Sequence, residues 1–100
     1  MNGDKKYFFL KLIPPRASFV QDMTDEERTI MYAHIAYWAP HVEAGTMIVM
    51  GPVADPNGGW GLGVIEVENR EQLDELLKND PANGLNHYEI YPMPAAKHKK

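Results

Sequence analysis

The chain of 100 residues contains no cysteine. This absence excludes disulfide bridges, cysteine nucleophiles and thiolate metal ligands, and it is compatible with a reducing compartment. Serine is nearly absent too, since Ser18 is the only one, and no nucleophile motif surrounds it. Covalent catalysis through a serine or a cysteine is therefore disfavoured.

Long hydrophobic runs are also lacking. No apolar stretch approaches the roughly 18–20 residues that a membrane span needs. The polar and charged residues 1–6 lead directly into a short apolar run, which is unlike a signal peptide. We therefore expect a cytoplasmic protein with no membrane partner.

Positive charge is scarce outside the C-terminus. The chain has 10 Lys and Arg against 14 Asp and Glu, a net charge of −4, and residues 97–100 hold three of the positive charges. The acidic remainder would repel phosphate, so no nucleic-acid partner is expected. Length and composition predict a single globular domain over residues 1–95. Residues 96–100 are expected to form a basic, solvated C-terminal tail.

Apolar patterning predicts four strands and two helices. The strands are expected at 7–13, 46–50, 60–68 and 87–91, with prolines ending the first, second and fourth. Thr24 and Glu27 form a capping-box pattern that opens the first helix, and Gly45 ends it. Asn69 opens the second helix. Residues 16–23 are predicted to be a connection, with 14–23 long enough to form part of a lid.

The order strand, helix, strand, strand, helix, strand predicts an α+β fold of the ferredoxin-like type. It has an antiparallel sheet with both helices on one face. The first strand carries apolar residues on both faces, so the uncovered sheet face is expected to form a homodimer or a higher even oligomer. Gly61 and Gly63 leave one face of the third strand bare, which predicts a close approach to the backbone there.

The first helix carries two stripes. Met31, Ile35, Trp38 and Val42 follow helical spacing and are predicted to pack on the sheet. His34, Tyr37 and His41 form a second stripe beside the first. Pro40 is expected to kink or interrupt the helix.

Several short motifs resemble the YciI-related (YCII) domain family of the dimeric α+β barrel superfamily. They cover almost the whole chain in the same order: residues 34–38, Gly45, Gly51-Pro52, Asp55 with Gly58, Asp80-Pro81, and residues 90–92. The resemblance implies a dimeric barrel and a suspected enzyme, with His34 and Asp80 as the active-site pair. The superfamily is also similar to muconolactone isomerases and small cofactor-free monooxygenases. Tyr37, Trp38 and Pro52 are the expected ligand-pocket residues.

Histidine beside a carboxylate suits proton transfer, because an imidazole ordinarily titrates near neutrality and a carboxylate fixes its tautomer. The expected substrate is a small apolar or aromatic-derived metabolite, with no cofactor. No metal site is expected, because His34 and His41 lack further convergent ligands. The alternative stays open that His34 and Asp80 are structural, and that the protein is a non-catalytic small-ligand-binding or dimeric assembly module. Aromatic residues at this spacing are also often core.

Overall fold

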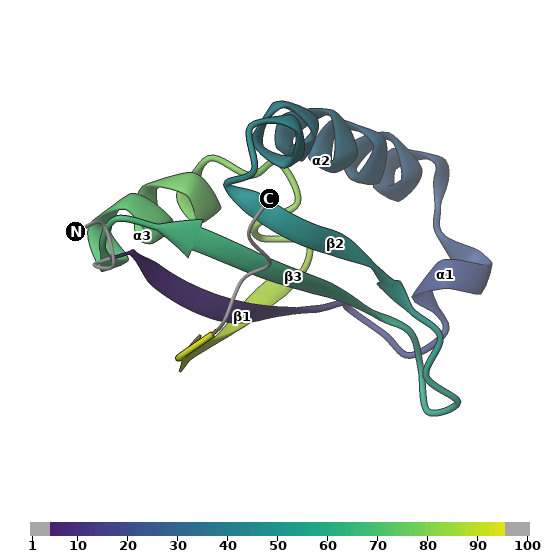
Figure 1. Cartoon of the computed structure of the whole chain (residues 1–100). Helices are drawn as coiled ribbons and strands as arrows, with labels where there is room; N and C mark the ends of the chain where they lie inside the picture. Colours follow the sequence, from purple (N-terminus) through teal and green to yellow (C-terminus); the bar gives the residue numbers. More distant parts are fainter. Residues whose placement is uncertain (1–4, 96–100) are drawn as a thin grey trace.

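The computed structural model describes residues 5–95, within which there are four strands and three helices. The elements are β1 (Lys6–Ile13), α1 (Phe19–Asp22), α2 (Asp25–Glu43), β2 (Met47–Val53), β3 (Trp60–Val67), α3 (Arg70–Lys78) and β4 (His87–Met93). All strand pairs are antiparallel and the sheet order is β2-β3-β1-β4. This is the ferredoxin-like α+β arrangement that the sequence predicts (Figure 1). The predicted tail, 96–100, lies outside the described residues.

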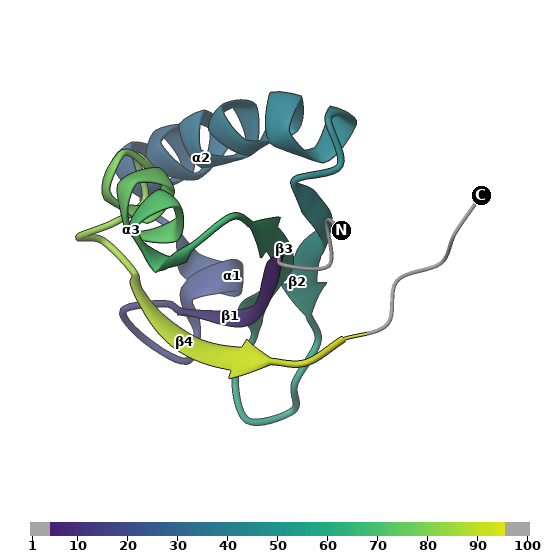
Figure 2. The same cartoon turned by 60° about the vertical axis from the view of Figure 1, so that its left-hand side comes forward.

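The long helices α2 and α3 lie on the same face of the sheet, as predicted (Figures 1 and 2). Helix α2 packs mainly over β2, and α3 packs over β3. Across residues 5–95, no helix covers the opposite face, and no helix combines the length and the apolar character needed to cross a membrane.

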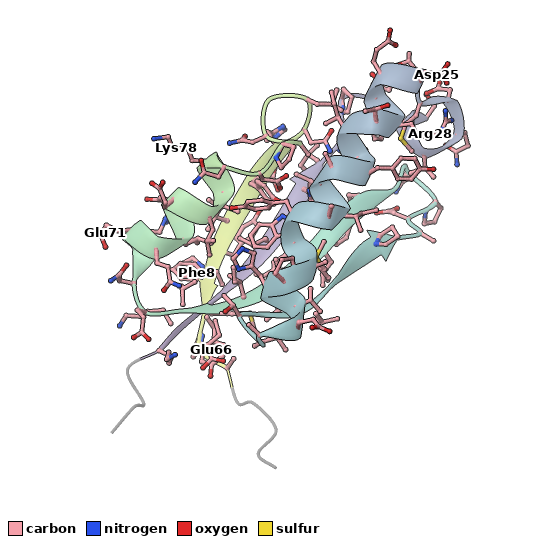
Figure 3. The ribbon with its side chains drawn as sticks, turned by 90° about the horizontal axis from the view of Figure 1, so that it is seen from above. Phe8, Asp25, Arg28, Glu66, Glu71 and Lys78 are labelled. Atoms are coloured by element: carbon pink, nitrogen blue, oxygen red, sulfur yellow. The ribbon has the colours of Figure 1, made fainter. Side chains whose placement is uncertain are left out.

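Strand alternation puts every second residue of β1 toward the helices. Phe8, Leu10 and Leu12 are buried, whereas Phe9 between them faces the uncovered side. Seen from above the helices, Phe8 of β1 lies between α2 and α3 (Figure 3). The core joins both helices to three strands, β1, β2 and β3. It consists of Phe8, Leu10, Trp38, Met47, Ile65, Val67, Leu73 and Leu77.

Both long helices begin as predicted. The Glu27 backbone N–H donates to Thr24 Oγ1 (3.1 Å), and the Thr24 N–H donates to Glu27 Oε1 (2.9 Å), which completes the capping box of α2. Asn69 caps α3 by accepting from the Gln72 N–H at 2.8 Å. Gly45 follows α2 with φ of 85°, a conformation that glycine adopts without strain.

Two strand ends differ from the prediction. Strand β2 continues through Pro52 to Val53, and β4 continues through Pro92 to Met93. Both strands lie at the edges of the sheet. A proline is tolerated there because its missing N–H can face away from the neighbouring strand.

The predicted packing stripe of α2 is only half correct. Trp38 is fully buried and Met31 is half-buried, but Ile35 and Val42 are 58% and 42% exposed. The buried residues of α2 are His34 and Trp38, so the inward face is rotated toward the second stripe. Ile35 and Val42 lie beside a cavity under the helix.

The predicted interruption at Pro40 does not occur, because α2 continues to Glu43 as one helix. Pro40 lies in the last turn, where the Ala44 N–H donates to its carbonyl at 3.0 Å. The proline forfeits only its own bond to the Ala36 carbonyl, and both residues are exposed, so water can reach that carbonyl. The position near the helix end makes the proline tolerable.

The segment predicted to be a plain connection contains the short helix α1. Its Phe19 is buried, 3% exposed, and points into the interior at one end of the sheet. A single apolar anchor in a four-residue helix gives almost no periodic signal, which explains why the pattern did not predict it.

Candidate functional site

A cavity of about 720 Å³ lies between α2 and the sheet. Its roof includes His34 and Trp38 from α2, and its floor includes Leu10 from β1. Tyr32 and Ile35, which are 65% and 58% exposed, mark the side where it opens to solvent. Cavities of this volume commonly bind small organic molecules.

Two glycines of β3 form part of the floor. A Cβ atom at Gly61 would lie 3.2 Å from Leu12 Cβ, and one at Gly63 would lie 3.3 Å from Met47 Sδ. These distances confirm the predicted close approach to the backbone. Any side chain at these two positions would project toward the helices, where the cavity lies.

The segment 14–23 closes one end of the cavity through Phe19 and neighbouring apolar residues. Arg16 fixes this segment to the start of α2 by donating to both carboxylate oxygens of Glu27, at 3.0 and 2.7 Å. It also donates to Asp22 Oδ1 at 2.8 Å. The Arg16 bonds, with the Thr24 N–H, lower the pKa of Glu27 to about 2.

His34 and Asp80 meet beside the cavity, although 46 positions separate them. His34 projects from the buried face of α2, and Asp80 follows α3. His34 Nδ1 lies 2.9 Å from each carboxylate oxygen of Asp80. The side chains are 8% and 0% exposed, so solvent screens the pair very little.

Three further groups donate to the Asp80 carboxylate. The Ala82 N–H reaches Oδ1 at 2.9 Å, and Oδ2 accepts from Trp38 Nε1 at 3.0 Å and from the Tyr88 hydroxyl at 2.5 Å. Burial by itself would raise the pKa of Asp80, but these hydrogen bonds, with that of His34 foremost, outweigh it. The pKa of Asp80 is therefore below its ordinary value, and the group is an ionised acceptor at neutral pH.

The ionised carboxylate determines the tautomer of His34. Because Asp80 only accepts, Nδ1 must carry a proton, and in the neutral ring Nε2 then keeps its lone pair. No hydrogen-bond partner reaches Nε2 from within residues 5–95, and His34 lines the cavity. The free nitrogen is thus available to a molecule bound there.

Tyr88 stays protonated, because burial and then the adjacent Asp80 raise its pKa. Its hydroxyl is a fixed donor rather than a base. Nothing in the sequence pattern singles out this residue. Pairing of β4 with β1 gives the one usable signal: Tyr88 lies opposite Leu12, a residue that faces the helices.

The three expected pocket residues have different positions. Trp38 and Pro52 line the cavity. Tyr37 is not among the lining residues: its ring packs edge-on against Trp38, and its hydroxyl donates to the Leu76 carbonyl at 2.6 Å, which ties α2 to α3. Tyr37, which contacts α3, and Trp38, which lines the cavity, are therefore adjacent residues with different positions in the structure.

Asn86 is a further cavity residue that the pattern did not indicate. It is 4% exposed, and it lies at the end of the loop that also holds Asp80. An asparagine just before a strand is common in turns, so composition offers no signal for a site.

The loop motif around Asp55 has a structural role. Asp55 Oδ1 accepts from the Asn57 N–H at 2.9 Å, and Oδ2 accepts from Trp60 Nε1 at 3.0 Å. The hydrogen bond from the Asn57 N–H contributes most to lowering the pKa of Asp55, and the bond from Trp60 contributes next. In the part of the chain that the structure describes, no three histidine or carboxylate side chains are grouped to hold a metal ion.

Comparison with protein families matches residues 7–95 to the model of the YCII-related domain. No curated protein matches the chain. The matched segment contains the cavity residues, both members of the His34–Asp80 pair, and the loop that joins Asp80 to β4.

Proposed function

Since the chain belongs to the YCII-related domain family, we propose that it is a small cofactor-independent enzyme, in which His34 transfers a proton on a metabolite held in the cavity. One observation carries the proposal. His34 is fixed at Nδ1 by a buried, ionised carboxylate, while the same ring lines a large apolar cavity. A base aimed into an apolar pocket is the arrangement that proton transfer needs.

In the proposed step, His34 Nε2 takes a proton from a carbon next to a carbonyl group or within a small ring. The imidazolium that forms keeps its Nδ1 bond to Asp80, and the buried negative charge stabilises it. Asp80 does not take the proton, because three other donors hold its oxygens. The same imidazolium then returns the proton to another position of the substrate.

The cavity supports a small apolar or aromatic-derived substrate. Its lining is mostly aliphatic and aromatic, and Arg28 is the one residue with a permanent charge among the described lining residues. Arg28 is 45% exposed in its side chain, and its guanidinium bonds Asp25 at 3.2 Å, near the beginning of α2 (Figure 3). The charge therefore lies toward solvent, away from His34.

A ligand-binding module without turnover is the second candidate. The observation that favours it is the structural role of Asp80, whose carboxylate joins α2, its own loop and β4 through His34, Ala82 and Tyr88. A group that holds three elements together has a reason to be present without catalysis.

Exchange of the C–H hydrogens of a bound compound for deuterium tests the two candidates. A panel of small uncharged aromatic and cyclic carbonyl compounds is screened by thermal shift, since binding to the folded state raises the apparent stability. Compounds that bind are then incubated with the protein in D₂O, and loss of their C–H signals is followed by NMR. General-base catalysis typically contributes 10²–10⁴-fold, so His34→Gln should slow the exchange at least about 100-fold.

His41→Gln is the matched control, because His41 lies on the same helix but outside the cavity lining. We expect it to leave the exchange rate nearly unchanged. Exchange that persists in folded His34→Gln would exclude the enzyme proposal. Binding without exchange in the unsubstituted protein would favour the binding module.

We also propose that the uncovered sheet face forms a homodimer. Phe9 lies at its centre, stacked on Tyr91 with ring centroids 5.6 Å apart and edge-on to Trp60 at 6.3 Å. This aromatic cluster on a face that no described helix covers supports sheet-to-sheet association. Light scattering at micromolar concentration should give about twice the chain mass, and Phe9→Glu should give a folded monomer. A monomer without substitution would contradict the proposal.

A further inference from the structure

Arg28 is a charged residue at the edge of an otherwise uncharged cavity. It lies near the beginning of α2, beside Asp25 (Figure 3). The cavity-lining residues that the structure describes include no Asp, Glu or Lys, so the permanent charge of the lining is positive. The whole chain, by contrast, has a net charge of −4. A lone cation beside an apolar cavity fits a ligand with an apolar body and one anionic group.

The guanidinium of Arg28 has N–H groups to spare. Its Nη1 donates to Asp25 Oδ1 at 3.2 Å, and its Nη2 has a long contact of 3.5 Å with the Met23 carbonyl. An arginine has five N–H donors, so three of them have no partner among residues 5–95. The Asp25 side chain is fully exposed, and water weakens such an ion pair so strongly that a ligand carboxylate can displace it.

Arg16, the other arginine beside the start of α2, is fully engaged. It donates to both carboxylate oxygens of Glu27 and to Asp22, and it is not a lining residue. It thereby neutralises two of the acids at this end of the molecule. Glu26 precedes Arg28 by two positions, and residues at this spacing do not face each other on a helix. The local charges therefore leave Arg28 open to an anion.

Tyr32 lies beside Arg28 on the cavity side of α2. Four positions separate these two lining residues, and residues four apart are neighbours on one helix face. Helical side chains lean toward the N-terminus, which brings the Tyr32 side chain over the turn that holds Arg28. Tyr32 is 65% exposed, and its hydroxyl has no hydrogen-bond partner in the part of the chain that the structure describes. The two residues together offer a cation and a hydroxyl donor at the cavity mouth.

We propose that Arg28 and Tyr32 bind the carboxylate of a monoanionic ligand whose apolar body fills the cavity. The inference rests on the proposed function, because it names the substrate class of that same cavity. Six positions separate Arg28 from His34, which corresponds to about 9 Å along the helix axis. The ligand is therefore a ring with a short carboxylate-bearing arm. The carboxylate stays at the mouth, and the reacting C–H bond lies beside His34.

Ligands of other charge fit the cavity less well. A cationic ligand would meet Arg28 and would find no acid among the described lining residues. A dianion such as a phosphate monoester would need more positive charge than one arginine supplies beside the acidic first turn of α2. A carboxylate deep in the cavity would lose its hydration, whereas one at the exposed Arg28 keeps part of it.

Two matched probes test the assignment. The compounds 3-(4-fluorophenyl)propanoate and 3-(4-fluorophenyl)propanamide have nearly the same shape and differ in charge, and ¹⁹F NMR gives a dissociation constant for each. A partly exposed ion pair with hydrogen bonds corresponds to roughly three- to tenfold in affinity. We expect the propanoate to bind more tightly by that factor, and Arg28→Gln should abolish the preference. Tyr32→Phe should reduce it roughly twofold.

Arg70 and Asp74 on α3 provide matched controls. Like Arg28 and Asp25, they are an arginine and a carboxylate paired within one exposed helix turn, with 2.8 Å between Arg70 Nε and Asp74 Oδ1. Neither of them lines the cavity. Arg70→Gln changes the net charge as Arg28→Gln does, and it should leave the carboxylate preference intact.

Asp25→Asn tests the same site with Arg28 in place. It removes the acid that competes with the ligand for the guanidinium, so the carboxylate preference should increase. Asp74→Asn makes the same change in net charge away from the cavity, and the increase in Asp25→Asn should be roughly twofold larger. This comparison decides the question even where Arg28→Gln does not fold.

Equal binding of both probes to the unsubstituted protein, or no binding of either at millimolar concentration, would overturn the inference. A carboxylate preference that survives in Arg28→Gln would overturn it as well, and so would an increase in Asp25→Asn no larger than that in Asp74→Asn. Each of these results leaves the proposed proton transfer intact. Failure of the proposed function has a separate signature, which is C–H exchange that continues in His34→Gln.

Discussion

Replacing Asp80 by asparagine tests the hydrogen-bond network that joins the site to the fold. The side chain of Asp80 is 0% exposed and accepts from His34, Ala82, Trp38 and Tyr88. Asparagine has nearly the same shape, but one of its two terminal atoms is an NH₂ group, which donates and cannot accept. The substitution therefore changes the hydrogen bonding with little change in packing.

The cost follows from which atom becomes NH₂. If the NH₂ group replaces Oδ2, Trp38 Nε1 and the Tyr88 hydroxyl lose their acceptor. If it replaces Oδ1, the Ala82 N–H loses its acceptor. The hydrogen bond from His34 Nδ1 is weakened in both cases, because it reaches both oxygens. Each buried donor left unpaired costs about 1–3 kcal/mol. The one or two donors left unpaired give about 1–6 kcal/mol, out of the roughly 5–15 kcal/mol that stabilise a domain.

Asp80→Asn should also change the pH dependence of stability. The pKa of Asp80 is below its ordinary value of 3.8 in the folded protein. The unfolded chain therefore binds this proton first as the pH falls, and the stabilisation, fully present above about pH 4, is lost at lower pH. Asparagine has no such proton, so this part of the acid sensitivity should disappear.

Urea unfolding followed by tryptophan fluorescence measures both effects, because Trp38 lies in the network. Tyr88→Phe is the matched comparison, since it removes one donor and leaves the carboxylate, and it should cost about 1 kcal/mol. A loss below about 1 kcal/mol in Asp80→Asn, or a loss no larger than that of Tyr88→Phe, would refute the network as the source of stability.

Three other substitutions probe features outside the network. Gly45→Ala should lower the free energy of unfolding by about 1 kcal/mol, because φ at Gly45 is 85°, a conformation that is strained for alanine. The cost is limited to this backbone strain, since a Cβ there meets no other atom within 4 Å. Arg16→Ala should raise the pKa of Glu27 from about 2 toward its ordinary 4.5, since the Arg16 bonds are the main cause of the shift, and a ¹³C carboxylate titration measures it. Ile35→Ala should cost less than about 1 kcal/mol in urea unfolding, because Ile35 is 58% exposed, whereas a core isoleucine would cost about 2–5 kcal/mol.

Local rules correctly predicted the features that local interactions determine. The Thr24–Glu27 capping box forms as expected, and alternation in β1 correctly separates Phe8 from Phe9. The errors occur where the position in the sheet overrides a local rule. Pro52 ends a strand in isolation, but on an edge strand it pairs with Gly61 inside the ladder.

The candidate site was predictable only in part. The resemblance indicated His34 and Asp80, and the structure places them 2.9 Å apart. Their chemical environment depends on donors from distant elements, such as Tyr88 on β4, and no pattern in one segment contains that information. The sequence gives no signal that the Asn86 side-chain oxygen is buried without a hydrogen-bond partner among residues 5–95, because burial and pairing can be read only from the structure.

The rotation of α2 links the packing error to the function. If Ile35 and Val42 packed on the sheet as the apolar stripe suggested, they would occupy the space above Gly61 and Gly63. In the structure the His34 and Trp38 face of the helix lies inward, where both residues contact the Asp80 carboxylate, and the exposed Ile35 lies beside the cavity. We infer that the network gives the helix its orientation as well as giving His34 its tautomer. Loss of Asp80 would then close or distort the cavity, so His34 substitutions report on chemistry more cleanly than Asp80 substitutions do.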